Sequence, residues 1–211
     1  MDIKRISLYI AAAIVAIIIG LGVGYWTLGR PAAVPKTFAL LLNPPKPLTA
    51  FNLEADDNAP FTKTDLEGRW SFLYFGYTHC PDLCPTTLTD LNKMMVQLEK
   101  LPSAEQPRVY FISVDPKRDT MALLKEYVHF FNPVFIGITG SVDQLHALAD
   151  PLGVAFSYDP PDQSGNYSVD HSSVIFLINP KGKVAAIYTP VLIPERMTAD
   201  YRAIVNYYGD R

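Results

Sequence analysis

The residues best suited to chemistry are the two cysteines, Cys80 and Cys84, in the segment HCPDLCP. Paired cysteines in an exported protein ordinarily form a disulfide, but a bridge across so short a loop constrains little of the unfolded chain. A close pair is better suited to a redox couple or to binding a metal ion through two thiolates. The cysteines leave both kinds of chemistry open, and a third residue must decide between them.

That third residue is sought among the four histidines of the chain. His129 and His146 lie in predicted helices beside apolar residues, so we expect ordinary, partly buried side chains. His79 adjoins Cys80 and could tune its thiolate, but a solvated loop side chain is the simpler expectation. His171 differs because it stands just before a predicted strand, on a loop that can face the cysteines. We therefore expect this ring and the two sulfurs to form one site.

Two thiolates and one imidazole form a soft ligand set. Such a set suits Cu(I), and with a weak further ligand it also holds Cu(II), whereas closed structural zinc sites normally use four protein donors. Copper is therefore the preferred metal for Cys80, Cys84 and His171. Asp170 could orient the imidazole and Asp82 could approach the thiolates, although both residue types are also common in turns and caps.

The elements that must position these residues alternate between strand and helix. Continuous apolar runs predict buried strands, and apolar residues spaced three and four apart predict helices. We predict strands at 70–77, 108–114, 134–138, 173–179 and 183–188, and helices at 85–101, 119–131, 142–149 and from about Pro194. Asp119 is the expected N-cap of its helix, and Pro151 is expected to shorten the helix before it.

This order of elements predicts an α/β, thioredoxin-like fold, in which helices cover both faces of a mixed central sheet. The cysteines then lie on the loop after the first long strand, outside the carboxyl end where open α/β folds carry ligands. The positive end of the following helix favours thiolate over thiol. Both sulfurs should therefore ionise readily.

An uncharged run at residues 6–28 stands apart from this domain. A helix of that length reaches about 34 Å and can span a hydrocarbon core of about 30 Å. The run is longer than a signal-peptide core, which favours an uncleaved transmembrane anchor. Lys4 and Arg5 precede it, so the positive-inside tendency predicts a cytoplasmic N-terminus at 1–5 and an exported C-terminal domain.

The remaining segments complete the predicted organisation. Residues 29–47 are rich in proline and read as a semi-rigid linker to a domain at 48–211. The net charge of −3 at pH 7, without a basic stripe, argues against nucleic acid as a partner. The N-terminal residues lack the Arg- and Ser-rich pattern of a transit peptide, so we expect a bacterial inner membrane rather than a mitochondrial one.

Four segments, in this order, closely resemble the Sco/SenC family. They are FGYTHCPDLCP at 75–85, VDPKRDT at 114–120, FIGITG at 135–140 and Asp170-His171-Ser172. The resemblance covers roughly residues 48–207. It implies a thioredoxin-like domain on one membrane helix, with copper bound by Cys80, Cys84 and His171. For VDPKRDT, strand termination and helix capping are a sufficient explanation.

The resemblance also implies a function in maturing the dinuclear copper centre of cytochrome c oxidase subunit II. As a metallochaperone rather than an enzyme, the chain would receive copper from an upstream periplasmic donor and pass it on by ligand exchange. Besides subunit II and the donor, its expected partner is membrane lipid around the anchor. Oxidation of the cysteine pair to a disulfide would remove both thiolates and abolish copper capture.

The alternative is a membrane-anchored thiol-disulfide oxidoreductase that reduces the cysteines of the oxidase subunit. The C-x-x-x-C spacing argues against it, because thioredoxin redox motifs are C-x-x-C. Residues 165–173 also contain no proline, where thioredoxin-like oxidoreductases generally place a cis-proline opposite their cysteines. A peroxidase is a third option, but the segment Thr78-His79-Cys80 does not reproduce the Thr-x-x-Cys arrangement of peroxiredoxins.

Overall fold

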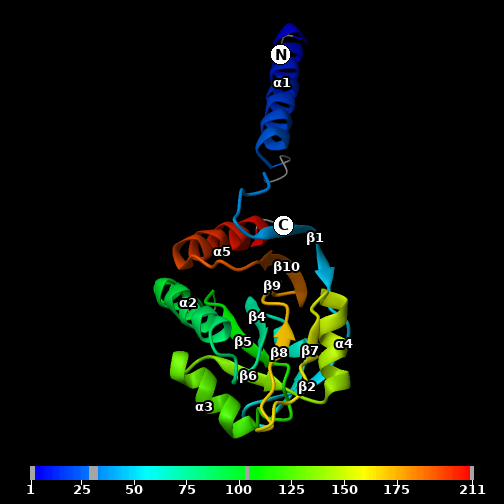
Figure 1. The fold of residues 1–211 in the computed structure, drawn as a ribbon. Helices are drawn as coiled ribbons and strands as arrows, with labels where there is room; N and C mark the ends of the chain where they lie inside the picture. Colours follow the sequence, from blue (N-terminus) through cyan, green and yellow to red (C-terminus); the bar gives the residue numbers. More distant parts are fainter. Residues whose placement is uncertain (1–2, 29–32, 103–104, 210–211) are drawn as a thin grey trace. The chain divides into compact units, whose positions relative to one another are not determined.

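The computed structural model describes residues 3–28, 33–102 and 105–209 (Figure 1). The chain forms two units, and helix α1 (Ile3–Leu28) belongs to the smaller one. The window Leu8–Tyr25 within α1 has a mean hydropathy of 2.3, which makes the helix long and apolar enough to cross a membrane. The run predicted at 6–28 is therefore helical. The larger unit, Lys36–Val205, carries the predicted site residues.

A mixed sheet of eight strands forms the centre of the larger unit, in the order β1-β10-β9-β4-β5-β6-β2-β3. The strands are β1 (Leu40–Pro47), β2 (Asn52–Ala55), β3 (Pro60–Thr62), β4 (Ser71–Gly76), β5 (Arg108–Ser113), β6 (Ile136–Thr139), β9 (Ile175–Asn179) and β10 (Lys183–Tyr188). β4, β5 and β6 run parallel to one another, and the other neighbouring pairs are antiparallel. Two shorter strands, β7 (Phe156–Tyr158) and β8 (Val169–His171), pair separately as a ribbon.

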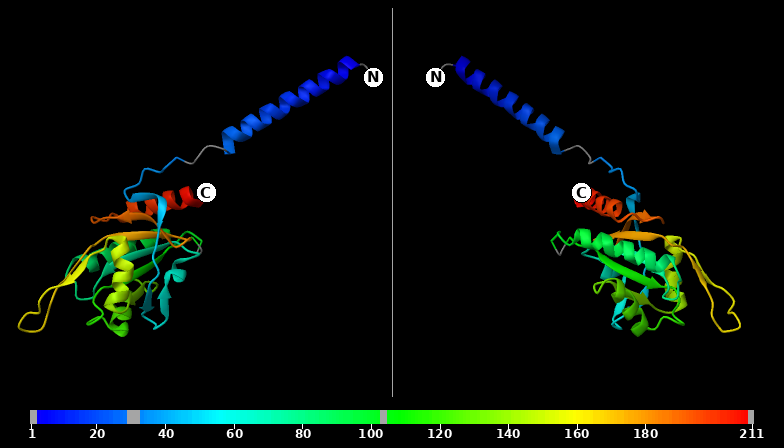
Figure 2. Two further views of the ribbon diagram at one scale, coloured as in Figure 1. Left: turned by 90° about the vertical axis from the view of Figure 1, so that its right-hand side faces the viewer. Right: turned by 60° about the vertical axis from the view of Figure 1, so that its left-hand side comes forward.

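Helices cover both faces of the sheet (Figures 1 and 2). They are α2 (Leu83–Leu98), α3 (Met121–Phe131), α4 (Val142–Leu152) and α5 (Pro194–Gly209), with a short 3-10 turn, η1 (Lys63–Leu66). On one face, Phe72 of β4 contacts Tyr201 of α5, and Phe111 of β5 contacts Tyr127 of α3. On the other face, Leu145, Leu148 and Ala149 of α4 belong to an apolar cluster that also contains residues of β4 and β5. The predicted thioredoxin-like fold is thus confirmed.

The cysteine loop begins at the end of strand β4, which is held firmly in the sheet. All six of its residues, SFLYFG, are buried, because β5 and β9 pair with both edges and helices cover both faces. A strand buried on both faces needs a continuous apolar run rather than an alternating one, which is the pattern at residues 70–77. The loop that leaves its carboxyl end therefore starts from a strand in which every residue is buried.

Two predicted features of the chain differ in the structure. The sheet already includes Leu40–Pro47, part of the segment interpreted as a linker, because prolines are tolerated in the edge strand β1. Helix α4 is not shortened by Pro151 and runs to Leu152. A proline leaves the carbonyl four residues earlier without its helical donor, and here Thr49 Oγ1 donates to that Ala147 carbonyl at 3.0 Å.

Candidate metal centre

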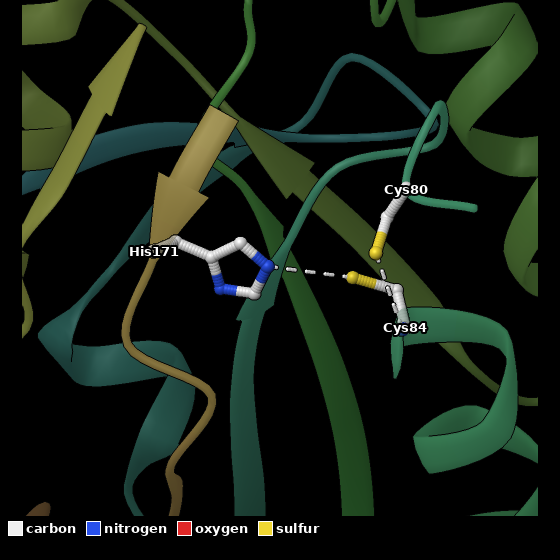
Figure 3. Close-up of side chains that lie close together, drawn as sticks. All are labelled: Cys80, Cys84 and His171. Atoms are coloured by element: carbon white, nitrogen blue, oxygen red, sulfur yellow. Dashed lines mark hydrogen bonds between the residues drawn. The ribbon is translucent and has the colours of Figure 1, made fainter. Parts of the chain in front are cut away.

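The structure brings the three predicted ligands together (Figure 3). Cys80 lies on the loop after β4, Cys84 in the first turn of α2, and His171 at the end of β8. Their Sγ and imidazole nitrogen atoms all lie within 4.8 Å of one another. Cys84 Sγ is 3.6 Å from His171 Nε2, across 87 positions of sequence. Among the described residues, no other group of this kind was found.

Gly76, the last residue of β4, creates the space for the buried sulfur. A Cβ at this position would lie 2.8 Å from Cys84 Sγ and 2.6 Å from the ring of Phe111. Both distances are well below van der Waals contact, so a side chain would displace the sulfur or the ring. Cys84 itself is completely buried, whereas Cys80 is partly exposed. One sulfur is therefore fixed in the core, and the other faces the surface.

The environments of the two sulfurs differ, and their acidities differ with them. The Cys84 thiol donates to the Cys80 sulfur, and the backbone N–H groups of Asp82 and Cys84 also point to it, so the pKa of Cys80 is well below its ordinary value. The pKa of Cys84 is raised, because its thiol keeps its proton to donate a hydrogen bond to the Cys80 sulfur and because Cys84 is buried. The prediction that both sulfurs ionise readily is thus wrong for Cys84. The helix terminus favours the thiolate only at Cys80.

His171 presents one ring nitrogen to the sulfurs because its other nitrogen is engaged. Nδ1 lies 3.3 Å from the Ser172 carbonyl, which can only accept, so the neutral tautomer that donates there leaves Nε2 with a lone pair for a metal ion. The ring of Tyr77 packs edge-on against the imidazole, with centroids 5.8 Å apart. The orienting group is therefore a backbone carbonyl, and not the Asp170 carboxylate suggested by the sequence.

Residues 114–119 contact both parts of the chain that carry the ligands: the cysteine loop and the segment before β8. These contacts were not predicted from the sequence. The Asp119 carboxylate accepts hydrogen bonds from the backbone N–H and the hydroxyl of Thr78, at 2.9 and 2.6 Å. The Arg118 guanidinium stacks on Tyr167 at 3.6 Å and donates to its carbonyl at 2.8 Å. The Tyr167 hydroxyl donates to Asp115 at 2.7 Å, and Asp115 also pairs with Arg118.

Asp119 was expected to cap helix α3, and this expectation is wrong. The N-cap is Thr120, whose side chain accepts a hydrogen bond from the backbone N–H of Leu123 at 3.3 Å. Asp119 is thereby free to face the cysteine loop. The sequence contained a signal for this difference, because Asp119 and Thr120 are successive candidate caps and only one residue can occupy the N-cap.

The other histidines lie outside this group of ligand atoms. His146 stacks on Phe156 with ring centroids 4.4 Å apart and bonds to Asp150, which fits the predicted structural role. His129 is half-buried in α3, also as expected. His79 is about half exposed, and its Nδ1 lies 3.0 Å from the Thr78 hydroxyl. Its expected position on a solvated loop is confirmed.

The arrangement can accept a metal ion with little movement. Metal–sulfur and metal–nitrogen bonds of about 2.3 and 2.0 Å allow two donors on one ion to be at most about 4.6 Å apart. The 3.6 Å separation of Cys84 Sγ and His171 Nε2 already satisfies this limit. The widest separation, up to 4.8 Å, must shorten by roughly 0.8 Å to reach the distance of about 4.0 Å between two sulfurs of a trigonal site. Two sulfurs and a lone-pair nitrogen therefore fit a soft, three-ligand metal site.

Known proteins share the sequence and the fold around these residues. A model of the SCO1/SenC family matches residues 43–206. Protein SCO2 homolog, mitochondrial, from Bos taurus is 40% identical over 140 residues, covering 66% of this chain and 53% of that protein. The chain spans about half the length of the mitochondrial SCO2 proteins that it matches.

Solved structures show the same similarity. The crystal structure of Arabidopsis thaliana ScoI with copper bound has a TM-score of 0.69 at 35% identity, covering 75% of this chain and 98% of that chain. The solution structure of apo Sco1 from Thermus thermophilus has a TM-score of 0.71 at 33% identity, covering 82% and 99%. The similarity extends over most of the unit that holds the two cysteines and the histidine.

Proposed function

The chain belongs to the SCO1/SenC family, and from this premise we propose that it binds one copper ion through Cys80, Cys84 and His171. The observation that carries the proposal is the approach of His171 Nε2 to within 3.6 Å of Cys84 Sγ. A relative at 35% identity has been crystallised with copper bound, which supports copper as the metal. The softness of two thiolates and one imidazole supports Cu(I) in particular, with Cu(II) as a second state.

The proposed function is copper delivery during assembly of the dinuclear centre of cytochrome c oxidase subunit II. Cys80 and His171 are partly exposed, so a partner can approach two of the three ligands while Cys84 stays in the core. An open hollow of about 420 Å³ adjoins the ring of His171 and is lined by Ala155, Phe156, Ser157, Asp170, His171 and Ser172. Ligand exchange would begin at this exposed side and end at the buried sulfur.

The proposed location is a bacterial inner membrane, with the N-terminus in the cytoplasm and the copper-binding unit in the periplasm. The apolar helix α1 supports a single-pass anchor in membrane lipid. The Lys4 and Arg5 charges support the orientation. The copper-binding unit would there meet subunit II and a periplasmic protein that supplies copper.

A second candidate is a thiol-disulfide oxidoreductase acting on the cysteines of the oxidase subunit. One observation favours it: the pKa of Cys80 is lowered by the neighbouring Cys84 thiol, and a partly exposed thiolate is a ready nucleophile. The buried Cys84 would then be the resolving thiol. Copper binding remains the better proposal because His171 has no evident function in thiol exchange at the place where it faces the sulfurs.

The test is an anaerobic Cu(I) titration of the reduced, detergent-solubilised full chain against a chromophoric Cu(I) chelator. We expect one Cu(I) per chain, and weaker binding for Cys80→Ser, Cys84→Ser and His171→Ala. Binding by the parent no tighter than by these variants would exclude the copper site. Rapid insulin reduction by the metal-free chain would instead favour the oxidoreductase.

A further inference from the structure

Asp119 is a buried carboxylate whose partners are unusual for its position. Its side chain is completely buried, at the end of the segment that follows β5. Its Oδ2 accepts from the Ser113 hydroxyl at 2.6 Å and from the Thr78 backbone N–H at 2.9 Å. Its Oδ1 accepts from the Thr78 hydroxyl at 2.6 Å. Two of these three donors belong to one residue of the cysteine loop.

Neither a strong ion pair nor helix capping explains why this carboxylate is buried here. Arg118, its neighbour, pairs with Asp115, and Thr120 caps helix α3. Within the described part of the chain, the only ion-pair partner of Asp119 is His79, whose Nδ1 lies 3.7 Å away and whose side chain is about half exposed. Burying a carboxylate is costly unless hydrogen bonds replace its water. The fully paired oxygens therefore fix Asp119 to the cysteine loop.

Thr78 is well placed to transmit this attachment to the metal ligands. It stands two residues before Cys80 and directly after Tyr77, whose ring packs against His171. Its backbone and its side chain bind different oxygens of one carboxylate, so the loop can neither slide nor rotate at this point without losing a hydrogen bond. A fixed Thr78 therefore limits the positions that both Cys80 and Tyr77 can take.

We propose that Asp119 is a positioning residue for the metal site, which holds the cysteine loop at the separation from His171 that copper requires. The inference rests on the proposed function and extends it to a residue that touches no ligand atom. Without Asp119 the loop would sample positions in which Cys80 is too far from the other two donors. Groups that orient metal ligands commonly change metal affinity by about 10- to 100-fold when they are replaced.

The test compares Asp119→Asn and Thr78→Val with the parent and with Thr120→Ala, all as reduced full chains in detergent. Thr120→Ala is the matched control, because it removes a polar contact at the adjacent residue without touching the cysteine loop. Cu(I) dissociation constants, the sulfur-to-copper charge-transfer band of the Cu(II) form and thermal unfolding are measured on each. Thr78→Ser, which keeps the hydroxyl, is the rescue variant.

We expect Asp119→Asn to weaken Cu(I) binding by about 10-fold or more and to shift the charge-transfer band. Thr78→Val should do the same more mildly, and Thr78→Ser and Thr120→Ala should match the parent in both measurements. Parent-like affinity and spectrum for Asp119→Asn would overturn the inference. Equal weakening by Thr120→Ala would overturn it as well, because the effect would then follow general stability.

A separate measurement distinguishes failure of this inference from failure of the proposed function. If the parent binds no Cu(I), the proposed function fails. The alkylation rate of Cys80 in the metal-free chain then tests whether Asp119 holds the cysteine loop in place. Release of the loop should change that rate in Asp119→Asn and Thr78→Val, with Thr120→Ala unchanged. Equal rates in all four proteins would refute the positioning role.

Discussion

Replacing Gly76 by alanine should damage the metal site more than it damages the fold. The new Cβ would lie 2.8 Å from Cys84 Sγ, where ordinary contact begins at about 3.4 Å, so the sulfur must move by about 0.6 Å. Metal–ligand distances tolerate about 0.2 Å. Overpacking of this kind costs about 1–3 kcal/mol of stability. We therefore expect Gly76→Ala to fold with a lower melting temperature and to bind Cu(I) at least about 10-fold more weakly, or about 1.4 kcal/mol.

Gly140→Ala is the matched control for this substitution. Its Cβ would lie 2.7 Å from Leu53 Cδ2, a similarly close approach just after β6 that does not involve the sulfurs. Both variants are measured as full chains in detergent, by thermal unfolding and by chelator competition for Cu(I). Gly140→Ala should lose stability and keep the copper affinity of the parent. If the two variants have the same copper affinity, the reasoning about the Cys84 sulfur is refuted.

Three further predictions follow from the same contacts. Because the pKa of Cys80 is lowered by the Cys84 thiol, Cys80 is a thiolate well below pH 8, and its iodoacetamide alkylation in the metal-free chain should change little from pH 8 to pH 6. An ordinary thiol would slow on the order of 100-fold over that range, and such slowing at Cys80 would contradict the prediction. Thr49→Val removes the donor to the Ala147 carbonyl and should lower stability by about 1 kcal/mol in denaturant unfolding, whereas Pro151→Ala should suppress that loss. His146→Ala should leave Cu(I) affinity unchanged in the same competition assay, since its ring packs on Phe156 outside the group of ligand atoms; a weaker affinity would place His146 in the site.

The sheet shows which parts of the fold the sequence could predict. Local apolar runs identified β4, β5 and β10 closely, because strands buried on both faces have a composition that is visible without knowledge of their neighbours. β1 was missed because the prolines at its end argue against a strand, and only pairing with β10 at the sheet edge makes it one. The short ribbon strands β7 and β8 were missed for the same reason, since each is defined by its partner.

The ligand residues of the site could be predicted from the sequence, but the contacts that hold them in place could not. Cys80, Cys84 and His171 are rare side chains in a recognisable pattern, so their meeting could be expected from the order of the elements. The different acidities of the two sulfurs could not, because they depend on which one is buried. The hydrogen bonds between Asp119 and Thr78 join residues 41 positions apart, so the local sequence shows that Thr120 competes with Asp119 for the N-cap but not what Asp119 contacts instead.

The central claim is that one copper ion is held by two sulfurs and the imidazole nitrogen of His171. X-ray absorption at the copper edge of the Cu(I)-loaded full chain tests it most directly, with His171→Ala measured beside the parent. The account predicts two sulfur neighbours and one nitrogen neighbour in the parent, and loss of the nitrogen in the variant. An unchanged ligand shell in His171→Ala, or a parent shell without nitrogen, would contradict it.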